Sequence, residues 1–228
     1  MQASERLMNS TKLVNSIPLS LNEKAILRHL GMARADDSQS RSTLERIRTI
    51  SPKVLASAEP KGLIGFCDVR TDSNGISILN GISALSESRD ACLRIDSQLL
   101  GKMCADSICI ALVAVTLGNE TDALIQQQSL NSGPLEALIT DAIASVMAEN
   151  AISVLSDIAR DACPVGAGHP GPRLSPGYGD FSLAWQIQLF DTFLKLQKIG
   201  IQVNPETFLL NPRKSVTGLM GFKAVKPL

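Results

Sequence analysis

The sequence lacks most of the features that point to nucleic acid, membranes or secretion. Lys and Arg together number 22, as do Asp and Glu, so the formal net charge is zero. Without a basic excess, nothing indicates binding to nucleic acid or to an anionic membrane surface. The longest apolar run, residues 110–115, is too short to cross a bilayer. Residues 1–10 are polar and lack the apolar segment of a signal peptide, so we expect a cytoplasmic protein.

Cysteine and histidine are also too sparse for several kinds of site. The five cysteines are an odd number with no Cys-x-x-Cys pair, which excludes a typical disulfide framework and a structural zinc site: Cys67, Cys92, Cys104, Cys109 and Cys163. Cys104 and Cys109 are expected to pack as small hydrophobic residues. Cys163 precedes a glycine-rich loop, where a reactive thiol is an alternative to an inert one.

No nucleophile–base set is apparent, because the only histidines are His29 and His169. A hydrolase using Cys163 and His169 has no support beyond their closeness in sequence. We assign no catalytic residue and no metal ligand.

What the chain does have is the composition of one globular domain. Of its 228 residues, 44% are hydrophobic and 19% are charged, which suits a single sizeable core. Hydrophobic periodicity and turn residues predict helices over residues 20–32, 42–58, 96–103, 121–128, 135–158 and 183–199. They predict strands over residues 62–69, 76–79, 107–117, 201–203, 208–210 and 215–222.

These patterns predict the fold class and the domain boundaries. We expect an irregular lead-in over residues 1–19, followed by a single α+β domain over residues 20–228. Ser20 is the expected N-cap of the first helix, with Glu23 completing a capping box, and Pro52 is expected to kink or break the second. The last three strands are expected to return to a central, mostly antiparallel sheet that is packed by helices.

The segment most suggestive of a binding site is residues 164–181, which contain five glycines and four prolines. Such a loop exposes backbone amides. Arg173, Ser175 and Tyr178 add a guanidinium, a hydroxyl and a phenol, which together can bracket a small ligand with a carboxylate and a flat ring. The alternative is a plain surface connection with a type II turn at residues 176–177.

Three segments in order resemble the activation domain of cobalamin-dependent methionine synthase. Residues 173–178, Arg-Leu-Ser-Pro-Gly-Tyr, resemble its Arg-x-x-Pro-Gly-Tyr signature. Residues 116–118, Thr-Leu-Gly, and 215–218, Ser-Val-Thr-Gly, are similar to two further family segments. The resemblance spans residues 26 to 222 and implies a methionine synthase activation domain-like fold.

The resemblance also implies a binding site for S-adenosylmethionine. Arg173 matches the family residue that pairs with the ligand carboxylate, which suits guanidinium geometry. Glu149 lies about 110° from the centre of the apolar stripe of its helix and takes the ammonium or a ribose hydroxyl, unless it is simply solvated. Amides around Ser175 and Gly177 are expected to contact the adenine edge, and Tyr178 the sulfonium.

The implied function is that of a reactivation subunit for a corrinoid-dependent methyltransferase such as methionine synthase. In the family, the methyl group passes from S-adenosylmethionine to reduced cobalt, and an electron donor such as a flavodoxin or ferredoxin is required. This chain has no cobalt-ligating Asp-x-His-x-x-Gly motif, so a partner must hold the cobalamin. The chain is thus expected to be an accessory of that enzyme.

Two departures from the family pattern support an alternative. The family tyrosine after Ser-Val-Ser-Gly is replaced at Leu219 or Met220, and an early aspartate has only Asp68 as a candidate counterpart. The alternative is a scaffold module of the same fold that docks on a corrinoid protein without binding S-adenosylmethionine.

Overall fold

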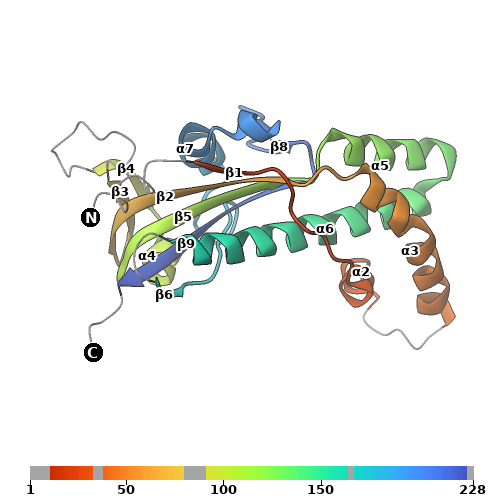
Figure 1. Cartoon of the computed structure of the whole chain (residues 1–228), viewed down its shortest axis with the longest axis horizontal. Coiled ribbons are helices and arrows are strands. Elements are labelled where there is room, and N and C mark those ends of the chain that lie inside the picture. The colour runs from red at the N-terminus through yellow and green to blue at the C-terminus, as the bar shows by residue number, and fades with distance from the viewer. Residues whose placement is uncertain (1–10, 33–37, 80–90, 164–166, 225–228) are drawn as a thin grey trace.

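A central antiparallel sheet organises the protein (Figure 1). The computed structural model describes residues 11–32, 38–79, 91–163 and 167–224. The main sheet has seven strands, with the order β4-β3-β2-β5-β9-β6 and β1 beside β2, and its pairings are antiparallel. Its strands are β1 Lys12–Val14, β2 Lys61–Asp72, β3 Gly75–Leu79, β4 Ala91–Asp96, β5 Ser107–Thr116, β6 Ala167–Pro170 and β9 Ser215–Ala224. The predicted α+β domain with an antiparallel sheet is confirmed.

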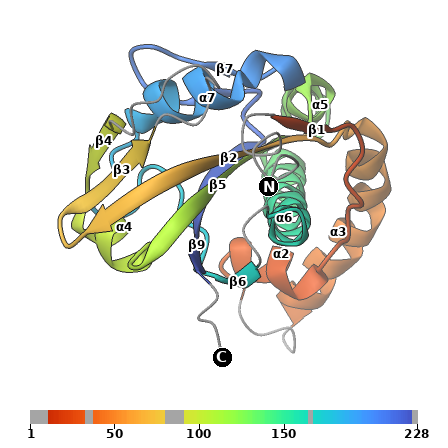
Figure 2. The same ribbon diagram turned by 60° about the vertical axis from the view of Figure 1, so that its left-hand side comes forward.

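Helical segments cover both faces of the sheet (Figure 2). The first face carries regular helices: α2 Glu23–His29, α3 Ser38–Ser57, α5 Asn119–Asn131 and α6 Pro134–Asp161. The second face carries shorter and less regular ones: α4 Gln98–Met103, a π-helix Gln186–Asp191, α7 Thr192–Leu194 and a 3₁₀-helix Leu196–Ile199. The sheet is therefore the middle layer of three.

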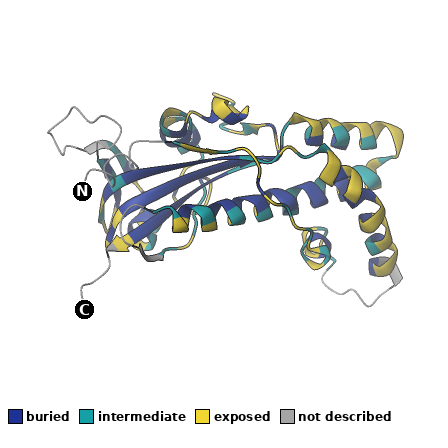
Figure 3. Ribbon diagram, in the orientation of Figure 1, coloured by how far each residue is buried: buried dark blue, intermediate teal, exposed yellow. Residues whose placement is uncertain are grey.

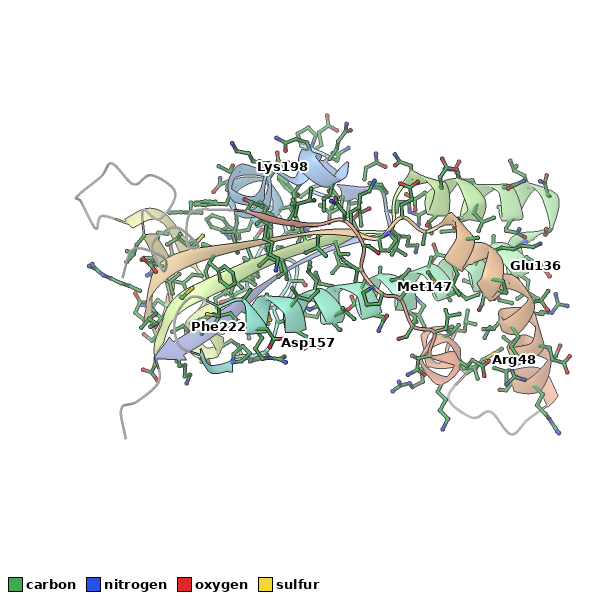
Figure 4. The ribbon with its side chains drawn as sticks, in the orientation of Figure 1. Arg48, Glu136, Met147, Asp157, Lys198 and Phe222 are labelled. Atoms are coloured by element: carbon green, nitrogen blue, oxygen red, sulfur yellow. The ribbon has the colours of Figure 1, made fainter. Side chains whose placement is uncertain are left out.

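Strand β5 has a continuous apolar sequence because both of its faces are buried. Ala111 and Val113 belong to the core on the α6 side, whereas Ile110 and Leu112 belong to the core on the opposite side. Figure 3 shows this burial along the central strands. In Figure 4, Met147 of α6 and Phe222 of β9 are labelled, and both belong to the first core.

Helix α6 contributes many of the buried residues of the first core. Pro134 occupies its first turn, where the missing amide costs nothing. Among the described residues, α6 is the one helix long and apolar enough to cross a membrane, with a mean hydropathy of 1.4 over its most apolar window. More than half of that window, 56%, is buried within the fold, so α6 is a core helix.

The amino-terminal expectations need three corrections. The lead-in contains strand β1, which pairs with β2. The first helix begins at Glu23, and its N-cap is Asn22, whose side chain accepts from the Ala25 amide at 3.0 Å. The Ser20 amide instead donates to Asn150 Oδ1 of α6 at 2.8 Å. Helix α3 continues through Pro52 without the break that was one of the two alternatives, and buried residues on both sides of the proline belong to the first core.

Of two later expectations, one is confirmed and one is wrong. The short helix expected over residues 96–103 is α4, which begins two residues later than expected, at Gln98, because β4 continues to Asp96. The segment 183–199, in contrast, is not one helix: Lys195 has a left-handed φ of 57° between α7 and the 3₁₀-helix. Leu194 and Leu196 are both buried in the second core. Residues two apart point in nearly opposite directions on a continuous helix, so burying both requires the break.

The carboxyl-terminal strands only partly follow expectation. β7 Gln202–Val203 and β8 Leu210–Asn211 pair with each other in a separate two-stranded sheet rather than joining the main one. The third strand, β9, does join the main sheet beside β5. β9 is therefore an interior strand of the main sheet, between β5 and β6.

Candidate functional site

The predicted binding loop is attached to the edge of β9. The Gly171 amide donates to Gly221 O at 2.8 Å. Leu174 and Leu219 exchange two backbone hydrogen bonds, of 2.9 and 2.7 Å. This part of the loop therefore extends the sheet by running antiparallel to β9.

Arg173 crosses β9 where that strand has no side chain. Gly218 is paired with Val113, which faces α6, so position 218 faces α6 as well. A Cβ atom at Gly218 would lie 2.7 Å from both Cγ and Cδ of Arg173. The glycine of the Ser-Val-Thr-Gly segment therefore makes room for the arginine stem.

The guanidinium of Arg173 then meets Glu149 of α6. Arg173 Nη2 lies 2.8 Å from Glu149 Oε2. The arginine side chain is only 21% exposed, whereas that of the glutamate is 60% exposed. Two residues that the sequence analysis selected from separate segments thus form one ion pair with its acidic end toward solvent.

Ser175 links this pair to the opposite face of the sheet. Arg173 Nη1 donates to Ser175 Oγ at 3.2 Å, and Ser175 Oγ donates to Thr217 O at 2.6 Å. Thr217 Oγ1 in turn donates to Gln186 Oε1 of the π-helix at 2.8 Å, and both of these side chains are buried. A continuous series of hydrogen bonds connects α6, the loop, β9 and the π-helix.

The Pro-Gly-Tyr part of the loop forms a tight turn. Tyr178 N donates to Ser175 O at 3.3 Å, and Gly177 has a φ of 97°, as a type II turn requires. The Gly177 amide donates to Phe181 O at 2.7 Å. The expected contact of this amide with adenine would have to displace that bond. Tyr178, in contrast, is 64% exposed.

Asp180 fixes the far end of the loop to α4. Ser97 Oγ donates to Asp180 Oδ1 at 2.5 Å, and the amides of Gln98 and Leu99 donate to its carboxylate at 2.7 and 3.2 Å. The Ser97 hydrogen bond, with these amides, lowers the pKa of Asp180 below its ordinary value. Sequence reasoning gave Asp180 no role, because its partners are more than 80 positions away.

The other two family-like segments meet at the start of β9. Ser215 Oγ donates to Thr116 Oγ1 at 2.9 Å, and the Gly118 amide donates to the same oxygen at 3.1 Å. Gly118 has a φ of 88° and lies at the N-cap of α5. Ser215 is three residues from Gly218, or about 10 Å along the strand. The three segments thus converge on β9.

Asp68 and the side chains of Leu219 and Met220, all discussed from sequence, do not join this site. Asp68 is opposite Cys109 on β5, and Cys109 is opposite Phe222 on β9. From these strand and residue spacings, the Asp68 backbone lies roughly 16 Å from that of Gly218. Leu219 and Met220 are both buried, on opposite faces of the sheet, so neither replaces the family tyrosine at the surface.

The cysteines lie apart from the Arg173–Glu149 pair. Cys67, Cys104, Cys109 and Cys163 form no disulfide with one another. Burial raises the pKa of Cys104 to about 11, and a hydrogen bond with Cys163 raises the pKa of the Cys109 thiol. The side chains of Cys92 and His169 lie outside the described part of the chain. Among the described residues, no group of three or more His, Cys, Asp and Glu is placed to hold a metal ion.

Comparisons with known proteins establish the fold. No protein-family model matches the sequence, and no curated protein matches it. A crystal structure of the MetH reactivation domain bound to AdoHcy matches with a TM-score of 0.71. The match has 16% sequence identity and covers 96% of this chain and 80% of that one. The chain therefore has the fold of that reactivation domain.

Proposed function

We propose that this protein binds S-adenosylmethionine at Arg173 and Glu149 and acts as a reactivation subunit for a corrinoid-dependent methyltransferase. The observation that carries the proposal is the adjoining cation and anion, 2.8 Å apart, at the edge of β9. The amino-acid end of S-adenosylmethionine carries a carboxylate beside an ammonium. The pair presents the two complementary charges side by side.

The arginine is already held in place for such a ligand. Its stem lies over Gly218, its guanidinium donates to Ser175, and its side chain is largely buried. A preorganised cation loses little conformational freedom on binding. The ligand carboxylate accepts hydrogen bonds from the guanidinium N–H groups, and the ligand ammonium donates to the exposed carboxylate of Glu149.

The remaining groups suit the rest of the ligand. Tyr178 is exposed on the turn that begins at Ser175, and its ring face attracts a cation such as the sulfonium. Methyl transfer from a sulfonium to reduced cobalt requires in-line positioning and little acid or base from the protein. The role of this chain is accordingly to bind and present the ligand, while a partner holds the cobalamin and a flavodoxin or ferredoxin supplies the electron.

Calorimetric titration with S-adenosylmethionine tests the binding. Arg173→Ala should weaken it by about 1.5 to 3 kcal/mol, or roughly tenfold to a hundredfold. Arg160→Ala is the matched control, because Arg160 also forms an ion pair on α6, with Asp157 at 2.8 Å, but at the exposed far end of the helix. That variant should bind like the wild type.

The second candidate is the scaffold module without a ligand. Three observations favour it: Arg173 and Glu149 already satisfy each other, the Gly177 amide is bonded to Phe181, and the two candidate replacements for the family tyrosine, Leu219 and Met220, are both buried. Folded wild-type protein that shows no heat of binding at millimolar S-adenosylmethionine, while still binding a corrinoid protein, would replace the first proposal with this one.

A further inference from the structure

A cavity that is lined in part by Glu149 lies beside the candidate site. It has a volume of about 410 Å³ and lies between α2, α6 and the start of β9. Glu149 contributes to its lining, but none of the described residues 171–181 does. Its basic residues are His29, Arg213 and Lys214. The cavity therefore shares Glu149 with the candidate site but has basic residues of its own.

Lys214 is the most informative residue of this cavity. Its side chain is only 9% exposed, and Nζ lies 2.8 Å from Asp141 Oδ1 and 2.8 Å from Ser145 Oγ. An ammonium has three N–H donors, and the described residues supply acceptors for two of them. A buried cation is costly unless its donors are satisfied. Because Lys214 lines the cavity, an acceptor on a bound ligand can complete its hydrogen bonding.

Arg213 adds a second donor at the mouth of the cavity. Its guanidinium is 69% exposed, and Nη2 lies 4.0 Å from Asp141 Oδ1, beyond hydrogen-bonding distance. Its main chain is fixed, since its amide donates to Asp122 Oδ2 at 2.6 Å. The position of the residue is thus set by α5, while its guanidinium N–H groups remain available to a ligand.

Most of the remaining lining is apolar, with Ser145 and Ser215 as the exceptions. Ala25, Val146, Ala148 and Val216 form walls beside these donors. The volume lies in the range of small-molecule pockets and exceeds what an inorganic ion needs. We propose that this cavity binds a small organic anion, with its carboxylate or phosphate on Lys214 and Arg213 and its apolar body against Val146 and Val216.

Nuclear magnetic resonance of the full chain, labelled with ¹⁵N, tests this site. The probes are phenyl phosphate and benzoate, with phenol as the neutral control, and the reporters are the amides of Lys214, Ser215 and Val216. Both anions should give saturable shifts, and the tighter one identifies the preferred headgroup. Lys214→Met should weaken binding about tenfold, and Arg213→Ala about threefold.

Two controls separate this site from its neighbours. Lys223→Met removes an exposed lysine of β9, 3.7 Å from Asp106, and should leave the binding of both anions unchanged. Arg173→Ala should leave phenyl phosphate binding intact while it weakens S-adenosylmethionine, so the two proposals can fail independently. The inference is overturned if phenol shifts the same amides with equal affinity. It is also overturned if Arg213→Ala, which keeps the buried lysine and should fold normally, binds both anions as the wild type does.

Discussion

The two faces of the sheet are built in different ways. On the first face, long regular helices pack through apolar stripes, and α6 alone supplies twelve buried residues. On the second face, a π-helix, a short α-helix and a 3₁₀-helix follow one another within residues 186–199. Both faces nevertheless bury large side chains completely. The irregular backbone of the second face therefore accompanies tight packing rather than replacing it.

The candidate site lies at the part of β9 that is linked to helices on both faces of the sheet. Arg173 crosses Gly218 to reach α6 on the first face, while Thr217, its neighbour on β9, bonds to the π-helix on the second. Ser175 joins the two arrangements through the carbonyl of Thr217. The regular face provides a rigid position for Glu149, and the irregular face fixes the strand and loop that carry Arg173.

The largest effects should come from truncating one core residue on each face. Met147 of α6 and Phe190 of the π-helix are both fully buried. Met147→Ala should lower the free energy of unfolding by about 2–5 kcal/mol and Phe190→Ala by about 3–5 kcal/mol, as measured by urea denaturation. Lys198→Ala, an exposed change on the second face (Figure 4), should stay within about 0.5 kcal/mol. A cost below about 1 kcal/mol for Phe190→Ala would show that the irregular face is loosely packed.

Gly218→Ala should disturb the Arg173–Glu149 pair by adding a side chain to β9. The new methyl group would lie 2.7 Å from the Arg173 stem and push it away from Glu149. We expect S-adenosylmethionine binding to weaken about tenfold in calorimetry, as it does when a charged hydrogen bond is lost. The double variant Arg173→Ala/Gly218→Ala should bind no worse than Arg173→Ala alone. Additive losses in that cycle would mean that the glycine acts independently of the arginine.

Thr217→Val should test the link to the second face. The change keeps the shape of the side chain but leaves the buried Gln186 Oε1 without its donor, 2.8 Å away in the wild type. The expected loss of stability is about 1–3 kcal/mol in urea denaturation. Changing Gln186 to Leu in the same protein should recover part of it, because both polar partners are then absent. No recovery would indicate that the hydrogen bond is not the cause.

The smallest effect should come from Asp180 and should depend on pH. The Ser97 hydrogen bond lowers the pKa of Asp180 in the folded protein. The stability that this carboxylate contributes is therefore present above its unfolded pKa of about 4 and is lost as the pH falls through the folded value. The urea midpoints of wild type and Asp180→Asn should differ at pH 7 and converge below about pH 4. An equal difference at both pH values would contradict the role of the charged form.

Sequence patterns predicted the first face better than the second for a physical reason. The stripe of α6 and the two-sided burial of β5 repeat regularly, so periodicity was sufficient to place them. The break at Lys195 depends on which core receives Leu194 and Leu196, and this is a property of the assembled fold. Likewise, β1 has only three residues and pairs with β2, which is distant in the sequence, so it leaves little local signal.

The same limit applied to the site. Residues 173–178 and 149 were identified because they match a known pattern, and the structure brings Arg173, Glu149 and Ser175 together. The functions of Gly218, Thr217 and Gln186 were missed because each depends on a contact across the sheet. Lys214 belongs to no recognised sequence motif, and only its burial beside Asp141 distinguishes it from the other lysines.

The central claim is that Arg173 binds the carboxylate of S-adenosylmethionine, and the most direct test removes that carboxylate from the ligand. Wild-type protein should bind decarboxylated S-adenosylmethionine about tenfold or more weakly than S-adenosylmethionine in calorimetry. Arg173→Ala should bind the two ligands with nearly equal affinity. If the wild type did not distinguish them, or if Arg173→Ala kept the full preference, the arginine would not be the carboxylate partner and the proposed site would be wrong.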